Sequence, residues 1–210
     1  YDGAIVPITT VGYGREWREW SAQQSENFDG LLDDNANSIR KTQDTVVNNF
    51  YDGASVTYKG YTAYGIKTSA NTELVDLGAG DLNIDFTSAA ATAENIRNAF
   101  LAILYRLRTG NNIVQDVTCY ISREIEENFQ RYFSTADISF GTLLENLKRI
   151  AGIADIKTDA KLSGNELCMV VLDSQFIQPL VGMAMSTVPI MRSNPFDNYN
   201  FLVWTAVGLQ

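Results

Sequence analysis

The sequence predicts an α+β fold in which the two ends of the chain form one domain and the middle forms another. Residues 25–52 carry apolar side chains at the 3.6-residue period of a long helix, and residues 80–190 alternate between helix and strand patterns. Residues 199–208 are apolar on both alternations, which is typical of a strand covered on both faces. We expect this strand to pair with the region after the long helix, so that the α/β block is an insertion.

The first twenty residues are predicted to form a β-hairpin. The apolar segment 5–11 leads to Gly12-Tyr13-Gly14, and the charged and aromatic segment 15–20 follows. If this second arm is a strand, Trp17 and Trp20 point to opposite faces, and the hairpin has no single face to bury. It would then project as an arm onto neighbouring subunits. The alternative is a helical turn, which places both tryptophans on one core-facing side.

Residues 25–52 are predicted to form one helix of about 40 Å, a spine along an elongated molecule. Acidic side chains gather at its start, where the helix dipole favours them, and Gly53 ends it. Its apolar stripe consists of Phe28, Leu31, Leu32, Ala36, Ile39, Val46, Val47 and Phe50.

The block 80–190 begins with a short predicted strand at residues 82–86, and three predicted helices and three further predicted strands follow. The first helix ends at Gly110, Ser122 is placed to cap the second, and the third ends at Gly152. The polar turn at residues 159–165 is expected to be an exposed tip. The three further predicted strands cover residues 113–121, 153–158 and 166–172.

The composition excludes several classes of function. The 210-residue chain has no histidine, so Ser-His-Asp and Cys-His nucleophile systems and His-ligated zinc or haem are absent. Its net charge of −9 disfavours binding through nucleic-acid phosphates. No apolar stretch approaches the ~20 residues that cross a bilayer, and no signal-peptide pattern opens the chain. The sequence predicts no catalytic, cofactor-binding or metal-binding residue, and no cofactor.

The two cysteines, Cys119 and Cys168, lie in apolar runs and are predicted to be small buried thiols. A disulfide or a reactive thiol is the alternative. The chain begins at Tyr1 and stops at Gln210 within a predicted strand, so we expect both ends to be cuts in a longer protein.

Several stretches are similar to sequences of one family of shell proteins. Residues 35–40 and 48–53 resemble the end of its spine helix, and residues 58–61 with 64–66 resemble the stretch that follows. Residues 179–182, 191–192 and 197–204 resemble its C-terminal return. With the order of predicted elements, these stretches identify a resemblance to the HK97-fold major capsid proteins of tailed bacteriophages, over nearly the whole chain.

The resemblance implies a division of the chain. Residues 1–22 would be an extended loop, residues 23–79 a peripheral domain with the spine helix, residues 80–190 an axial domain, and residues 191–210 the truncated return strand of the peripheral domain.

The resemblance also implies a function. Copies of such a protein assemble into pentamers and hexamers of an icosahedral phage head around double-stranded DNA. The chain would be made in the cytoplasm of the bacterial host and end in the virion, without a membrane. Its partners would be itself, the packaged DNA without sequence-specific binding, and scaffolding, portal and decoration proteins.

Some members of that family cross-link covalently through a lysine of the extended loop, and residues 1–22 contain no lysine. We therefore expect non-covalent contacts to lock the subunits. Trp and Arg are the residues that commonly anchor interfaces. The expected subunit interface consists of Arg15, Glu16, Trp17, Arg18, Glu19 and Trp20.

Three other functions compete with the phage head. Encapsulin nanocompartments share the fold, so a shell around a cargo enzyme is the nearest alternative. A small α/β enzyme would use Cys119 or the carboxylates Glu124, Glu126 and Glu127, although the helix dipole suffices to explain that acidic cluster. A monomeric binding module is disfavoured by a hairpin with tryptophans on both faces.

Overall fold

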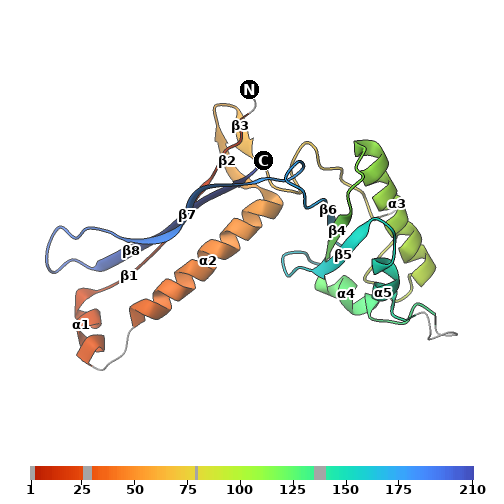
Figure 1. Cartoon of the computed structure of the whole chain (residues 1–210). Coiled ribbons are helices and arrows are strands. Elements are labelled where there is room, and N and C mark those ends of the chain that lie inside the picture. Colours follow the sequence, from red (N-terminus) through yellow and green to blue (C-terminus); the bar gives the residue numbers. More distant parts are fainter. Residues whose placement is uncertain (1–2, 26–29, 79, 135–140) are drawn as a thin grey trace. The chain divides into compact units, whose positions relative to one another are not determined.

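The computed structural model describes residues 3–25, 30–78, 80–134 and 141–210, and it divides into two compact units. We call Tyr1–Thr72 with Gln178–Gln210 the terminal unit, and Glu73–Ile177 the inserted unit. Both are drawn in Figure 1. Together the described residues form a mixed fold of helices and strands, as predicted.

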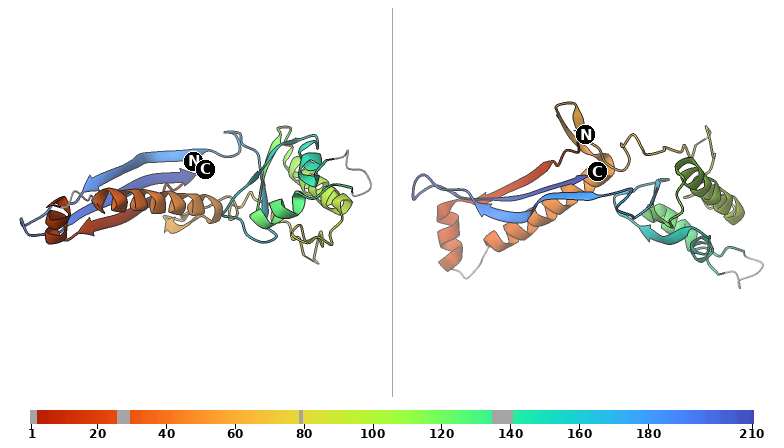
Figure 2. Two further views of the ribbon diagram at one scale, coloured as in Figure 1. Left: turned by 90° about the horizontal axis from the view of Figure 1, so that it is seen from below. Right: turned by 45° about the horizontal axis from the view of Figure 1, so that its top comes forward.

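The terminal unit is built on a three-stranded antiparallel sheet with the order β1-β8-β7. Its strands are β1 (Ile8–Arg15), β7 (Pro179–Pro189) and β8 (Tyr199–Leu209). Strand β8 is central in this sheet, and nearly all of its residues are buried or half-buried, which confirms the prediction of a strand covered on both faces. In Figure 2 the three strands lie side by side along the length of this unit.

The predicted partner of the C-terminal strand was wrong. The region after the long helix forms β2 (Ala54–Tyr58) and β3 (Tyr61–Ala63), which pair with each other in a separate two-stranded sheet. Lys59 and Gly60 between them both have positive φ, at 49° and 85°. Consecutive left-handed residues make the tight turn that closes a hairpin on itself, so β2 and β3 satisfy each other locally.

The predicted N-terminal hairpin was also wrong. Gly12, Tyr13 and Gly14 lie within β1, and the next residues form helix α1 (Trp17–Ser25). The strand that pairs with β1 is β8, over all eight residues of β1. Gly14 permits this pairing, because a Cβ there would lie only 2.6 Å from the carbonyl oxygen of Tyr199.

The predicted spine helix is present as α2 (Gly30–Asp52), which packs against β1 and β8. Its 23 residues span about 35 Å. Phe28 of the predicted stripe lies outside the described residues.

The face that α2 buries differs from the predicted stripe. The buried residues are Gly30, Ser38, Thr42 and Tyr51, whereas Leu32 is 65% exposed. Thr42 Oγ1 donates to the carbonyl of Ser38 at 2.8 Å, so this hydroxyl is satisfied inside its own helix. Small side chains let a helix lie close to a sheet. The other stripe residues flank the contact: Ala36 is exposed, and Leu31, Ile39, Val46, Val47 and Phe50 are half-buried.

The inserted unit has a sheet of order β5-β4-β6, in which β5 is parallel and β6 antiparallel to β4. Its helices begin at side-chain caps from Thr92, Ser122 and Thr142, and the Ser122 cap confirms a prediction. The strands are β4 (Val117–Ile121), β5 (Ile153–Thr158) and β6 (Leu167–Val170). The helices are α3 (Ala93–Asn111), α4 (Arg123–Phe129) and α5 (Leu143–Lys148).

Three buried phenylalanines form the centre of this unit. Phe86, Phe100 and Phe129 pack edge to face, with ring centroids 5.5–6.2 Å apart. Phe86 comes from a loop that two amide side chains hold: Asn165 accepts from its N–H at 2.9 Å, and Asn128 donates to its carbonyl at 2.7 Å. The short strand predicted at residues 82–86 was wrong, because these residues lie in a loop that contributes Phe86 to the core without regular secondary structure.

The limits of the inserted unit differ from the predicted 80–190. The unit covers Glu73–Ile177, because β7 pairs with β8 and belongs to the terminal unit. Backbone hydrogen bonds between Gln178 and Gln210, at 2.9 and 3.0 Å, begin the return. The sequence pattern does not distinguish a strand of one sheet from a strand of the other.

The phenylalanine cluster predicts a large effect of truncation. Phe129→Ala should lower the free energy of unfolding of the inserted unit by about 3–5 kcal/mol, because it removes a fully buried ring and leaves a cavity. Denaturant unfolding measures this change. Tyr105→Ala, at a ring that is 68% exposed, is the control and should change it by less than about 1 kcal/mol.

The inserted unit should also lose stability in acid. Hydrogen bonds from Arg106 to Asp81 and from Lys148 to Asp155 hold the pKa of each carboxyl below its ordinary value of 3.8. A lowered folded-state pKa gives stabilisation that is present above the ordinary value and lost as the pH falls through the folded-state value. Between about pH 5 and about pH 2, the melting temperature of the double variant Asp81→Asn/Asp155→Asn should fall less steeply than that of the natural chain. Equal slopes would contradict this assignment.

Candidate assembly surface

Helix α1 packs its two tryptophans onto the same segment of the chain. The Trp17 ring lies 5.3 Å from the ring of Phe196, and the Trp20 ring lies 4.5 Å from that of Tyr199. The guanidinium of Arg192 stacks on Tyr199 at 3.9 Å. Trp17 and Trp20 therefore lie on one side of a helix against their own chain, which confirms the helical alternative.

Arg15 joins the sheet to the spine helix. Its Nε donates to Asp34 Oδ2 at 2.8 Å, with both side chains about 70% covered. The hydrogen bond to Asp34 raises the pKa of Arg15. Gly30 is buried beside this pair, and a Cβ there would lie 3.0 Å from Arg15 Cζ and 2.9 Å from Gln23 Oε1. The start of α2 is thus fitted closely onto β1 and α1.

The six residues predicted as an interface separate into two groups. Arg15, Trp17 and Trp20 are half-buried and serve contacts within the chain. The remaining three are exposed on the outer side of the β1–α1 junction, where Arg18 lies 5.3 Å over the Trp17 ring. These surface residues are Glu16, Arg18 and Glu19.

The loop between β7 and β8 presents two large apolar side chains. Met191 is 96% exposed and Phe196 is 70% exposed. The loop is braced by its own hydrogen bonds, since Arg192 Nη1 donates to the carbonyls of Pro195 and Asp197 at 3.1 and 3.3 Å. A shallow hollow of about 380 Å³ lies among its residues. A braced loop that exposes apolar groups is typical of a contact surface.

The β2–β3 hairpin is a second apolar surface of the terminal unit. Val56, Tyr58 and Tyr61 are 46%, 63% and 42% exposed, and Tyr64 follows at 53%. The sequence shows the alternation of tyrosines, but only the structure shows that these side chains are exposed. Tyrosines of this kind are enriched in protein interfaces.

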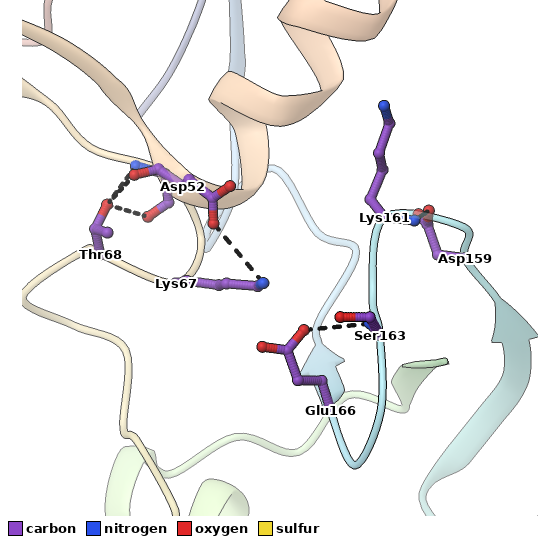
Figure 3. A network of polar contacts seen from close by, with 8 residues as sticks. Asp52, Lys67, Thr68, Asp159, Lys161, Ser163 and Glu166 are labelled. Carbon is purple, nitrogen blue, oxygen red and sulfur yellow. Dashed lines mark hydrogen bonds and ion pairs between the residues drawn. The ribbon is translucent and has the colours of Figure 1, made fainter. Parts of the chain in front are cut away.

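Polar contacts around the end of α2 and around the 159–166 turn serve structure. In Figure 3, Lys67 Nζ lies 3.7 Å from Asp52 Oδ1, and Thr68 Oγ1 donates to the Asp52 carbonyl at 3.2 Å. Within the turn, the Ser163 N–H donates to Glu166 Oε2 at 3.4 Å. Each set fixes a chain reversal within its own unit.

The residues of the enzyme alternative do not form a catalytic group. Cys119 is buried, and burial raises the pKa of its thiol, which disfavours the nucleophilic thiolate. No disulfide joins it to the half-buried Cys168. Glu124 and Glu127 are exposed at the start of α4, and Glu126 is half-buried. Ser122 caps that helix and donates to the carbonyl of Gly164 at 2.5 Å.

The two hollows described and the search for metal-ligand clusters give no catalytic or metal site among the described residues. A hollow of about 500 Å³ lies beside α3, and its carboxylate, Asp85, accepts hydrogen bonds from the N–H and hydroxyl of Thr87 at 2.9 and 2.6 Å. These bonds lower the pKa of Asp85, which makes it a weak base. Among the described residues, no group of three or more Cys, Asp or Glu side chains is arranged to hold a metal ion. In the same part of the chain, no helix is long and apolar enough to span a bilayer.

Solved shell structures share this fold. The chain resembles the capsid of Myoviridae phage XM1 with a TM-score of 0.70 and 14% identity, over 98% of this chain and 70% of that one. It resembles a structure of Mycobacterium phage Che8 with a TM-score of 0.57 and 9% identity, over 97% and 66%. A virus-like particle from Pyrococcus furiosus matches with a TM-score of 0.54 and 13% identity, over 98% and 72%.

These likenesses confirm the predicted α+β class and the HK97-like fold. No curated protein sequence matches the chain. All of residues 1–210 match a family of unknown function, DUF6260. The chain therefore belongs to DUF6260, and its fold is the HK97-like fold of capsid shells.

Proposed function

We propose that this chain is a major capsid protein, a structural protein whose copies assemble into pentamers and hexamers of an icosahedral phage head around double-stranded DNA. The observation that carries the proposal is the likeness to the phage XM1 capsid over 98% of the chain. The protein works in the virion after synthesis in the cytoplasm of a bacterial host. It acts through contacts rather than catalysis, in keeping with the buried Cys119 and the exposed positions of Glu124 and Glu127.

In this proposal the terminal unit has the role of the peripheral domain and the inserted unit that of the axial domain. The exposed apolar groups of the β7–β8 loop and the β2–β3 hairpin support contacts between copies. The net charge of −9 supports a shell that encloses DNA without binding it tightly. Scaffolding, portal and decoration proteins are the further partners that we propose for such a head.

A nanocompartment shell of the encapsulin type is the second candidate. The likeness to the virus-like particle from Pyrococcus furiosus supports it, with a TM-score of 0.54. The two candidates differ in content, because a phage head contains DNA and a nanocompartment contains a cargo protein. The fold is common to both.

Electron microscopy and light scattering of the protein in its full natural length test the proposal. We expect closed particles of uniform size. Particles purified from their natural source should contain DNA that resists added nuclease and becomes sensitive after the shell is disrupted. A protein cargo without DNA would favour the nanocompartment, and a persistent monomer at all salt concentrations would contradict both shells.

The surface residues Glu16, Arg18 and Glu19 should contribute to contacts between subunits. Arg18→Glu should lower the yield of shells at least several-fold and leave the melting temperature of the free subunit within about 2 °C, because exposed charges add little to folding. Trp17→Ala is the matched comparison, and it should lower the subunit's own melting temperature through loss of the Phe196 contact. Unchanged shell yield for Arg18→Glu would remove this surface from the interface.

A further inference from the structure

Strand β7 is a long edge strand with an open side. In the order β1-β8-β7 it pairs with β8 on one side, and no described strand pairs with its other side. Figure 2 shows β7, in light blue, along the margin of the sheet. Most of its eleven residues are exposed, including Val181 at 65% and Val188 at 41%. An open edge of this length presents backbone N–H and C=O groups that can accept another strand.

The edge lacks the usual protection by charge. No charged residue occurs between Asp173 and Arg192, in a chain whose net charge is −9. Natural edge strands that stay unpaired commonly carry lysine or inward-pointing charges. Two acidic copies repel each other, and this repulsion is weakest where they meet through an uncharged segment such as β7.

The sequence of β7 places residues of similar kind at equal distances on either side of its centre. It reads PLVGMAMSTVP, centred on Ala184. Two copies that pair antiparallel about this residue place side chains of similar kind opposite each other. The pairs are Pro179 with Pro189, Leu180 with Val188, Val181 with Thr187, Gly182 with Ser186, Met183 with Met185, and Ala184 with itself.

We propose that β7 pairs with β7 of a second copy, antiparallel about Ala184, so that two terminal units share one six-stranded sheet. The contact is isologous, since each copy uses the same strand around a two-fold axis. Pro179 and Pro189, which lack an N–H, fall at the two ends of the shared ladder, where a missing donor is tolerated best. The inference rests on the proposed function to the extent that a shell brings identical copies together.

Cysteine cross-linking tests the pairing and its register. In a Cys168→Ser background, Ala184→Cys should form a disulfide-linked dimer under mild oxidation, because residues that face each other across an antiparallel pair lie within disulfide range. Met183→Cys mixed with Met185→Cys should cross-link, whereas Met183→Cys alone should cross-link several-fold less, since the diagonal separation is about 7–8 Å. Thr45→Cys, exposed on α2, is the control and should remain monomeric.

A charge exchange gives an independent readout that does not depend on a thiol. Ala184→Lys and Ala184→Asp should each abolish the association of their own copies, because like charges would face each other on the axis. A mixture of the two should restore it as a heterodimer, measured by light scattering and native mass spectrometry. Circular dichroism of each variant checks that the subunit is folded.

The tests separate failure of this contact from failure of the proposed function. Cross-linking is measured on free subunits and on assembled particles. If Ala184→Cys forms particles but gives no disulfide-linked dimer, either in the particles or as free subunits, the β7 pairing is overturned and the shell function stands. Specific linkage at Ala184 in a protein that never forms particles would support the pairing and contradict the shell.

Discussion

The terminal unit depends on β8 being paired along both of its sides. Residues near the start of the chain form β1 on one side, and residues after the insertion form β7 on the other. This pairing joins segments that lie before and after the inserted unit in the sequence. Helix α2 then covers β1 and β8, and the ion pair between Arg15 and Asp34 fixes its start. Without β8 in the centre, neither edge strand would have a partner among the described elements.

In this arrangement, several apolar side chains of the terminal unit remain exposed after folding. The face of α2 toward the sheet is formed by Ser38 and Thr42, while larger side chains such as Leu32 remain outside. The β7–β8 loop exposes Met191 and Phe196 in the same way. A chain that folds with apolar groups left on its surface is suited to bury them against other copies, as a shell subunit does.

The inserted unit has the opposite character. Its three phenylalanines form a closed core, its helices have side-chain caps, and its one fully buried thiol has a raised pKa. The hollow beside α3 contains Asp85, whose pKa is lowered by its hydrogen bonds to Thr87. Under the proposed function, the contacts of this protein are made by strand edges, loops and exposed rings rather than in a pocket.

Local patterns in the sequence determined much of this fold. The helical period predicted for residues 25–52, the cap at Ser122 and the two-sided apolar character of residues 199–208 are properties of neighbouring residues. The structure confirms the helix over residues 30–52, the cap and the strand. The choice of strand partners was not determined in this way. The pairing of β8 depends on which distant segments of the chain meet. Because β8 supplies the hydrogen-bonding partner of β1, the residues after Arg15 do not need to form the second strand of a hairpin, and they form helix α1. The buried face of α2 includes Ser38 and Thr42, which hydrophobic periodicity alone does not identify. Sequence periodicity records what each segment can form, whereas the tertiary structure decides which segments pair and which surfaces stay open.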